Sequence, residues 1–147
     1  MTNWAALLPG ALPVSPETID SAPAVAGAYI LLIHLPHPVD VAIGKVAGHL
    51  PAGWHAYAGS ANGPGGLRAR LRRHFRRDKA VHWHVDRLTL LADRLAALAV
   101  PGESECALGR ALAGAGLGEP ALAGFGSSDC AICATHLLRW TAGQPPV

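Results

Sequence analysis

Two tyrosines and a short basic segment are the parts of this sequence whose residue types suit chemistry. Tyr29 closes a Gly-Ala-Tyr tripeptide, and Tyr57 opens a Tyr-Ala-Gly tripeptide. Six arginines lie between positions 68 and 77, and Lys79 follows them. Clustered positive charge is the electrostatic feature expected where a protein binds phosphate groups. A tyrosine hydroxyl has a pKa near ~10, so it acts as a base at neutral pH only beside a metal or another cation.

These features follow one another in a set order. After the two tyrosines comes a predicted helix that carries Arg70 and His74 four residues apart, and Glu105 opens a later predicted helix. This ordered set resembles the GIY-YIG nuclease superfamily, which is named after its two tyrosine tripeptides. Tripeptides of this kind occur often by chance, whereas the ordered set does not.

The resemblance implies a divalent-metal-dependent endonuclease that hydrolyses phosphodiester bonds in nucleic acid. It implies that Tyr29 is the general base and that Tyr57 helps to position the attacking water. Arg70 would clamp the phosphate, and His74 would hydrogen-bond a tyrosine or the phosphate. Glu105 would hold Mg²⁺ or Mn²⁺, since a carboxylate oxygen suits such a cation.

A narrower resemblance covers about residues 25 to 140. It looks like the Uri-type branch of the superfamily, the DUF123 proteins. The matching signatures are Tyr-Ala-Gly-Ser, Lys79 with His82-Trp83-His84-Val85-Asp86, Glu105-Cys106, and the segment 124–130 with Cys133 and His136. Some members of this branch are fused to a DNA-repair glycosylase. The resemblance therefore implies DNA as the nucleic acid, a role in repair, and a DNA-repair protein as a partner.

The sequence departs from the superfamily pattern in three places. The two tyrosines are further apart than in the best-known members, because a strand-like segment around 41–45 lies between them. The asparagine that the family often has near its end has no clear counterpart, and Ser127-Ser128-Asp129 is the candidate replacement. Glu103 is an alternative to Glu105 as the metal ligand.

The basic segment predicts a surface that contacts nucleic acid. Its members are Arg68, Arg72, Arg73, Arg76, Arg77 and Lys79. Structural interpretations compete with each of these roles: an arginine-rich helix is often a solvated face, and tyrosines in apolar strands are often core residues. A nucleic-acid-binding module that does not cut is therefore one alternative function. Such a module would not need the glutamate.

A cluster of histidines follows the basic segment. His82 and Asp86 are four residues apart and would share one face of a helix. We expect His82 at the active site as a proton relay or phosphate contact. The alternative is structural, with Trp83 as a core anchor beside two capping histidines.

The three cysteines and one histidine offer a Cys₃His set. Cys130, Cys133 and His136 are spaced by two residues each, and Cys106 comes earlier. Thiolate and imidazole ligands suit structural Zn²⁺ in a closed tetrahedral site. The usual zinc pattern pairs two knuckles, whereas Cys106 stands alone, and buried free cysteines are common. A zinc-stabilised interaction domain is thus a further alternative.

The hydrophobic patterns predict the elements that carry these residues. Strands are expected at 28–33, 39–46, 54–60, 95–100 and 135–140, and helices at 67–75, 82–91 and 103–113. Leu67, Leu71 and Phe75 form the apolar stripe of the first helix. This order predicts an α+β fold, in which helices flank a small, mainly antiparallel or mixed sheet of GIY-YIG-like type.

Length and composition agree with one folded domain. Half of the 147 residues are apolar and 15% are charged, which excludes a disordered chain. Residues 1–23 are rich in Ala and Pro and show no period, so we expect a mobile arm that can dock locally, before a domain at 24–141 and a tail at 142–147. The odd number of cysteines and the absence of a secretory signal pattern predict a cytoplasmic protein without a membrane span.

Overall fold

Most strands belong to one antiparallel sheet with the order β1-β6-β2-β5-β8-β7. The computed structural model describes residues 4–43, 46–81, 84–121, 136–141 and 145. The strands of this sheet are β1 (Leu12–Val14), β2 (Gly27–Leu35), β5 (Gly53–Ala61), β6 (Arg94–Pro101), β7 (Gly118–Pro120) and β8 (Leu137–Trp140). Every pairing among the described strands is antiparallel, which confirms the predicted α+β fold.

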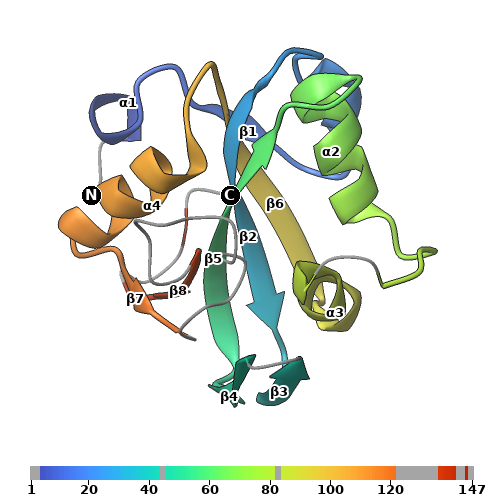
Figure 1. Cartoon of the computed structure of the whole chain (residues 1–147), viewed down its shortest axis with the longest axis vertical. Helices are drawn as coiled ribbons and strands as arrows, with labels where there is room; N and C mark the ends of the chain where they lie inside the picture. Colours follow the sequence, from blue (N-terminus) through green and yellow to red (C-terminus); the bar gives the residue numbers. More distant parts are fainter. Residues whose placement is uncertain (1–3, 44–45, 82–83, 122–135, 142–144, 146–147) are drawn as a thin grey trace.

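Helices cover both faces of the sheet, as Figure 1 shows. One face carries α2 (Gly66–Phe75) and α3 (His84–Leu91), and the other carries α4 (Glu105–Gly114). The short helix α1 (Trp4–Leu7) and the 3₁₀ turn η1 (Ile19–Ser21) lie in the N-terminal segment. No helix in the described part of the chain is long and apolar enough to cross a membrane.

Strand β2 is the centre of the molecule. Eight of its nine residues are buried, as expected for a strand that is covered on both faces. Successive side chains point to opposite faces, so Tyr29, Leu31 and Ile33 pack in one core with α2 and α3. Ile30 and Leu32 pack in a second core with α4. The strand predicted at 28–33 is confirmed and extends two residues further.

The N-terminal segment has more structure than its composition predicted. Instead of an arm without regular structure, residues 12–14 form β1, which pairs with Ala97–Ala99 of β6. Leu8, Val14 and Ala22 are buried. The sequence did not predict this strand, because a three-residue edge strand is too short to show a period and because Ala97, the partner of Val14, comes 83 residues later.

The expected single strand at 39–46 is two strands. Val39–Ile43 (β3) and Val46–Leu50 (β4) form an antiparallel hairpin that makes a separate two-stranded sheet. As a result, β2 and β5 pair directly, from Gly27 opposite Ala61 to Leu35 opposite Gly53. The segment between the two tyrosines therefore does not separate their strands.

The later elements agree with the sequence patterns. The strand predicted at 95–100 is β6, and the stripe of Leu67 and Leu71 is buried on α2. The helix expected at 103–113 begins at Glu105, because the Ser104 hydroxyl caps it by accepting a hydrogen bond from the Ala107 amide. The helix expected from position 82 is described from His84 onward.

Candidate active site

Tyr29 and Tyr57 lie on adjacent strands and point to the same face of the sheet. Tyr57 of β5 is directly opposite Leu31, and Tyr29 of β2 is directly opposite Gly59. The two tyrosines are therefore diagonal neighbours on the face that carries α2. Tyr29 is buried, whereas Tyr57 is half-buried and reachable from solvent.

The glycines of both tripeptides allow close approaches. A Cβ atom at Gly59 would overlap the hydroxyl and ring of Tyr29, so the tyrosine lies across this position. A Cβ atom at Gly27 would come within 2.8 Å of the Cα of Pro101 on β6. Each tripeptide thus combines a tyrosine with a glycine that leaves room for it or for a neighbouring strand.

Helix α2 brings a histidine to the buried tyrosine. The Tyr29 hydroxyl lies 2.6 Å from Nε2 of His74, whose ring is also buried. Burial, with the nearby positive charge of Lys79, lowers the pKa of His74 to about 3. A neutral imidazole has one N–H and one acceptor nitrogen, so in the Nδ1–H tautomer of His74 the Tyr29 hydroxyl donates this hydrogen bond to Nε2.

Both tyrosines are held in the protonated form by their surroundings. Burial and the neighbouring Tyr57 raise the pKa of Tyr29 far above its usual range, whereas Arg70, by its charge and a hydrogen bond, opposes this rise. Burial and the negative charge of Glu105 raise the pKa of Tyr57 to about 12, and Arg70 again acts in the opposite direction. Tyr29, Tyr57, Arg70 and Glu105 are therefore one electrostatic cluster.

Glu105 reaches this cluster from the first turn of α4, which packs on β2 and β5. Its carboxylate is about one third exposed, and Oε2 lies 4.0 Å from Nδ1 of buried His136. A lone, solvent-accessible carboxylate suits a cation such as Mg²⁺ that keeps most of its water ligands. Within the described residues no group of three or more His, Cys, Asp or Glu side chains is arranged around a metal position.

Asp86 supports the cluster and was missing from the predicted site. It is fully buried in the first turn of α3 and forms two hydrogen bonds with Arg73, of 2.9 and 3.0 Å. The Lys79 ammonium lies 3.9 Å from Asp86 and donates to the carbonyls of Arg73 and His74 at the end of α2. The signal that could have identified it was an aspartate in the predicted helix that follows the seven basic residues 68–79.

A family model described as "Domain of unknown function DUF123" matches residues 28–146, which include the whole cluster. The chain belongs to the DUF123 family. No curated protein and no solved structure matches it. The description of the family gives no activity.

Most of the predicted nucleic-acid contacts in this DUF123 domain have intramolecular partners. Arg72 pairs with Asp20 at 2.6 Å, and the remaining contacts are to backbone carbonyls. These are Arg68 to Ala22, Arg76 to Asp78, and Arg77 to Thr89 and Ala92. Together with Arg73 and Lys79, these side chains tie α2 to the N-terminal segment and to α3.

Three of the predicted site residues lie outside the described residues. They are His82, Cys130 and Cys133. The other two members of the Cys₃His set are described and lie together, with Sγ of Cys106 3.5 Å from Nε2 of His136. The described site residues Tyr29, Tyr57, Arg70, His74 and Glu105 are brought together.

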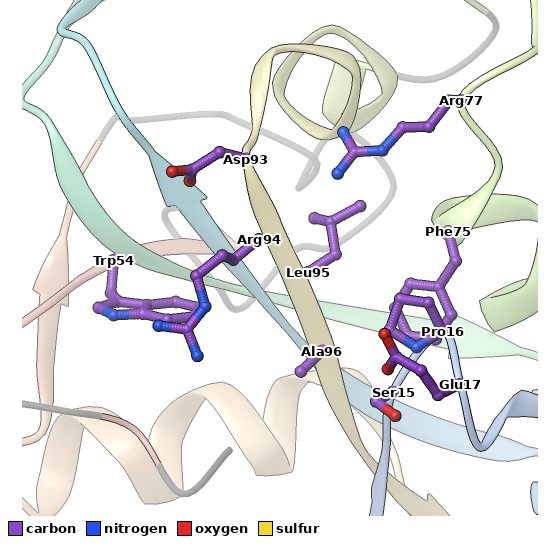
Figure 2. Close-up of a pocket in the computed structure, with 10 residues that line it drawn as sticks. All are labelled: Ser15, Pro16, Glu17, Trp54, Phe75, Arg77, Asp93, Arg94, Leu95 and Ala96. Carbon is purple, nitrogen blue, oxygen red and sulfur yellow. The ribbon is translucent and has the colours of Figure 1, made fainter.

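A separate cavity of about 540 Å³ lies beside the edge of β6, next to the stretch that pairs with β1. Figure 2 shows the Arg94 guanidinium near the Trp54 ring, at 5.2 Å from its centre, and Phe75 on the other side of the strand. Arg94 is paired with His34, at the far end of β2 from Tyr29. The cavity is therefore distinct from the tyrosine cluster.

Proposed function

We propose that this DUF123 domain is a divalent-metal-dependent endonuclease of the GIY-YIG type, Uri branch, that hydrolyses phosphodiester bonds in DNA. One observation carries the proposal. Tyr29, Tyr57, Arg70, His74 and Glu105 come from four different elements, yet they form one cluster of hydrogen bonds and mutual pKa shifts. A purely structural role would not need a phosphate-binding cation, two tyrosines and a carboxylate at one place.

Arg70 is the phosphate ligand in this proposal. It is half-buried on α2, one helical turn before His74, and it lies close enough to both tyrosines to lower their pKa values. A guanidinium offers a fork of donors that matches two phosphate oxygens. Arg70 would hold the scissile phosphate beside the tyrosines and stabilise the charge that develops on it.

Tyr29 is the general base, because in the Nδ1–H tautomer of His74 the proton of the Tyr29 hydroxyl has Nε2 as its acceptor. A proton from the attacking water would pass to the Tyr29 oxygen as the hydroxyl proton moves to Nε2 of His74, and the resulting hydroxide would attack phosphorus. The P–O bond to the leaving sugar oxygen would break in the same displacement, and that oxygen would take a proton from solvent. The raised pKa of Tyr29 and the lowered pKa of His74 make this transfer costly in the metal-free protein. Tyr57, the more accessible hydroxyl, would orient the water.

Glu105 is the proposed ligand for Mg²⁺ or Mn²⁺. Its negative charge raises the pKa values of both tyrosines, so neutralising that charge favours their ionised forms. A divalent cation, when bound, would supply this neutralisation and promote ionisation of a bound water. The chemistry of the base and the metal ligand would then be coupled through Glu105.

The exposed arginines of α2 and its C-terminal extension would contact the DNA backbone. Arg72, Arg76 and Arg77 are exposed, although each also has an internal partner. A module that binds DNA without cutting is less well supported, because binding alone does not need Glu105 beside the two tyrosines. DNA repair and a repair-protein partner are proposed on the family resemblance alone.

The test is cleavage of labelled substrates by the wild type and Arg70→Ala. Single-stranded, duplex, flap and branched DNA, and RNA, would each be incubated with Mg²⁺, Mn²⁺ or EDTA. We expect metal-dependent cleavage by the wild type and a loss of at least about a hundredfold in the variant. Arg110→Ala changes an exposed arginine on α4 and is the control. Binding without any cleavage, or cleavage that survives Arg70→Ala, would refute the proposal.

A matched pair of glutamate variants tests the metal ligand. Glu105→Gln should remove cleavage, whereas Glu103→Gln changes an exposed carboxylate whose oxygen accepts a hydrogen bond from the Ser104 amide. Glu103→Gln should retain at least about half of the activity. The opposite result would move the metal ligand to Glu103.

A further inference from the structure

Lys79 carries its ammonium into the protein rather than to its surface. The residue follows the end of α2, and its side chain is 4% exposed. The ammonium donates to the carbonyl oxygen of His74 at 2.8 Å and to that of Arg73 at 3.2 Å. A lysine that neutralises a DNA phosphate needs an accessible ammonium, so these contacts favour a role of Lys79 inside the protein.

The two carbonyls that accept from Lys79 belong to the last turn of α2, which ends at Phe75. The final carbonyls of an α-helix have no partner within the helix and need donors from elsewhere. A cation at this end also interacts favourably with the helix dipole. The ammonium of Lys79 therefore holds the C-terminal turn of α2 from outside the helix.

A buried carboxylate keeps this ammonium in place. Oδ1 of Asp86 lies 3.9 Å from Nζ of Lys79 and accepts a hydrogen bond from Arg73 at 2.9 Å. A buried charge is costly unless an opposite charge lies beside it. Burial lowers the pKa of Lys79 to about 8 and Asp86 opposes this shift, so the ammonium is charged at neutral pH. Since Asp86 is on α3, these contacts join the two helices on this face of the sheet (Figure 1).

His74 is the residue on which these contacts converge. Its carbonyl accepts from Lys79, and Nε2 of its ring lies 2.6 Å from the Tyr29 hydroxyl. Burial and then the positive charge of Lys79 are the main causes that lower the pKa of His74, so the ammonium also acts on the ring through its field. The backbone and the ring of His74 are thus held by different partners.

We propose that Lys79 is a positioning residue: by holding the end of α2, its ammonium keeps the imidazole of His74 in contact with the Tyr29 hydroxyl. Its effect on cleavage rests on the proposed nuclease function, whereas its effect on His74 can be measured without substrate. A helix cap alone would change stability but not the state of the imidazole, and a DNA contact would change binding instead.

Nitrogen NMR of the His74 ring at neutral pH tests the positioning directly, with His74→Gln to assign the signals. The wild type should show the well-separated nitrogen signals of a single tautomer. In Lys79→Met these signals should move towards the average of the two tautomers, and Lys79→Arg, which keeps the charge and the donors, should restore them. Arg87→Met removes an exposed arginine of α3 and is the control. Unchanged His74 signals in folded Lys79→Met would overturn the proposal.

Cleavage kinetics and DNA binding then separate the possible roles. Lys79→Met should lower kcat by about tenfold or more and change KM by less than about twofold. The salt slope of DNA binding should stay that of the wild type. An unchanged kcat with a slope smaller by about one unit would make Lys79 a DNA contact and refute the positioning role. If the wild type cuts no substrate while Lys79→Met still alters the His74 signals, the nuclease proposal fails and the positioning of His74 stands.

A measurement on the intact contact keeps the test decisive if Lys79→Met fails to fold. The sequence has two lysines, Lys45 and Lys79, so Lys45→Arg leaves Lys79 as the one lysine. Its ammonium should then give a slowly exchanging nitrogen–proton signal at neutral pH, with a coupling to the carbonyl carbon of His74. Rapid exchange with water and no such coupling in this folded variant would overturn the proposal.

Discussion

Gly59 and Tyr29 are directly opposed in the β2–β5 ladder, and the tyrosine ring occupies the space that a side chain at position 59 would need. The glycine of one tripeptide therefore positions the tyrosine of the other. This relationship explains why the two tripeptides act as one unit, although Tyr57 comes 28 positions after Tyr29 in the sequence.

Replacing Gly59 with alanine should displace Tyr29 from His74. We expect a loss of about 1–3 kcal/mol in the free energy of unfolding, because a methyl group must be forced into a filled space. The displaced hydroxyl should reduce cleavage by about a hundredfold. Gly63→Ala is the control, since a Cβ atom there would meet no atom within 4 Å. Equal activity of the two variants in the cleavage assay would contradict this prediction.

His74 predicts a specific pH dependence of stability. Its pKa is about 3 in the folded protein and about 6.5 in the unfolded chain, so the unfolded state binds more protons between these values. Stability should therefore fall as the pH decreases from about 6.5 towards 3. The charged groups that influence His74 are Lys79, Asp86, Arg70 and Arg73, and the tyrosine partner is Tyr29.

The variant His74→Gln isolates this effect. Glutamine can still accept the Tyr29 hydrogen bond but does not titrate. Urea unfolding at a series of pH values should show a slope smaller by about 1.4 kcal/mol per pH unit in this window. His49→Gln, at an exposed position, should keep the slope of the wild type. An unchanged slope in His74→Gln would mean that His74 is not held neutral.

Two neighbouring arginines should differ sharply in their effect on stability. Arg73→Gln removes the two hydrogen bonds that Arg73 donates to buried Asp86. This change should cost about 3 kcal/mol, and the nearby Lys79 ammonium should limit the loss. Arg72→Gln breaks an exposed ion pair with Asp20 and should cost less than about 1 kcal/mol. Chemical denaturation of both variants measures the difference, and equal losses would contradict the buried role of Arg73.

The variants of Arg72 and Arg73 also distinguish a structural role of these arginines from contact with DNA. If Arg72 contacts the DNA backbone, Arg72→Gln should weaken binding and lower the salt slope by about one unit. Fluorescence anisotropy with labelled duplex at several salt concentrations would measure this slope. A slope equal to that of the wild type would show that this face does not follow the DNA.

The N-terminal segment should contribute to stability despite its composition. Val14 is 3% exposed and its neighbour Leu12 is 45% exposed, so they offer a matched pair on β1. Val14→Ser should cost about 2 kcal/mol, because it places an unpaired hydroxyl in the core, whereas Leu12→Ser should cost less than about 0.5 kcal/mol. Thermal unfolding of the two variants checks this expectation, and similar melting temperatures would contradict it.

The sequence predicted the elements whose patterns are long and uniform. Strand β2 is apolar at nearly every position because both faces are covered, and the leucines of α2 repeat at helical spacing. The order of tyrosines, arginine, histidine and glutamate also identified residues that the fold brings together. Local patterns were sufficient for β2 and α2 because the covered faces of each element set its own apolar pattern, whereas the site residues were identified by the resemblance of their order to the superfamily.

The remaining features depend on contacts between distant segments. A turn divides the stretch at 39–50 into β3 and β4, and alternation alone cannot distinguish a hairpin from one long strand. The partners of Arg77 are backbone carbonyls, which are present at every residue and leave no sequence signal. The role of β1 likewise depends on β6, because Val14 pairs with Ala97, which comes 83 residues later in the sequence.

The direct nine-residue pairing of β2 and β5 has a consequence for how this protein can be altered. The two tyrosine strands are aligned by their own ladder, and the β3–β4 hairpin that connects them is a separate sheet. A change in the length of this hairpin should therefore leave the alignment of Tyr29 and Tyr57 unchanged. This connection is a place where evolution or an engineer can insert a peptide, a fluorophore or a whole recognition domain while the β2–β5 ladder keeps the two tyrosines aligned.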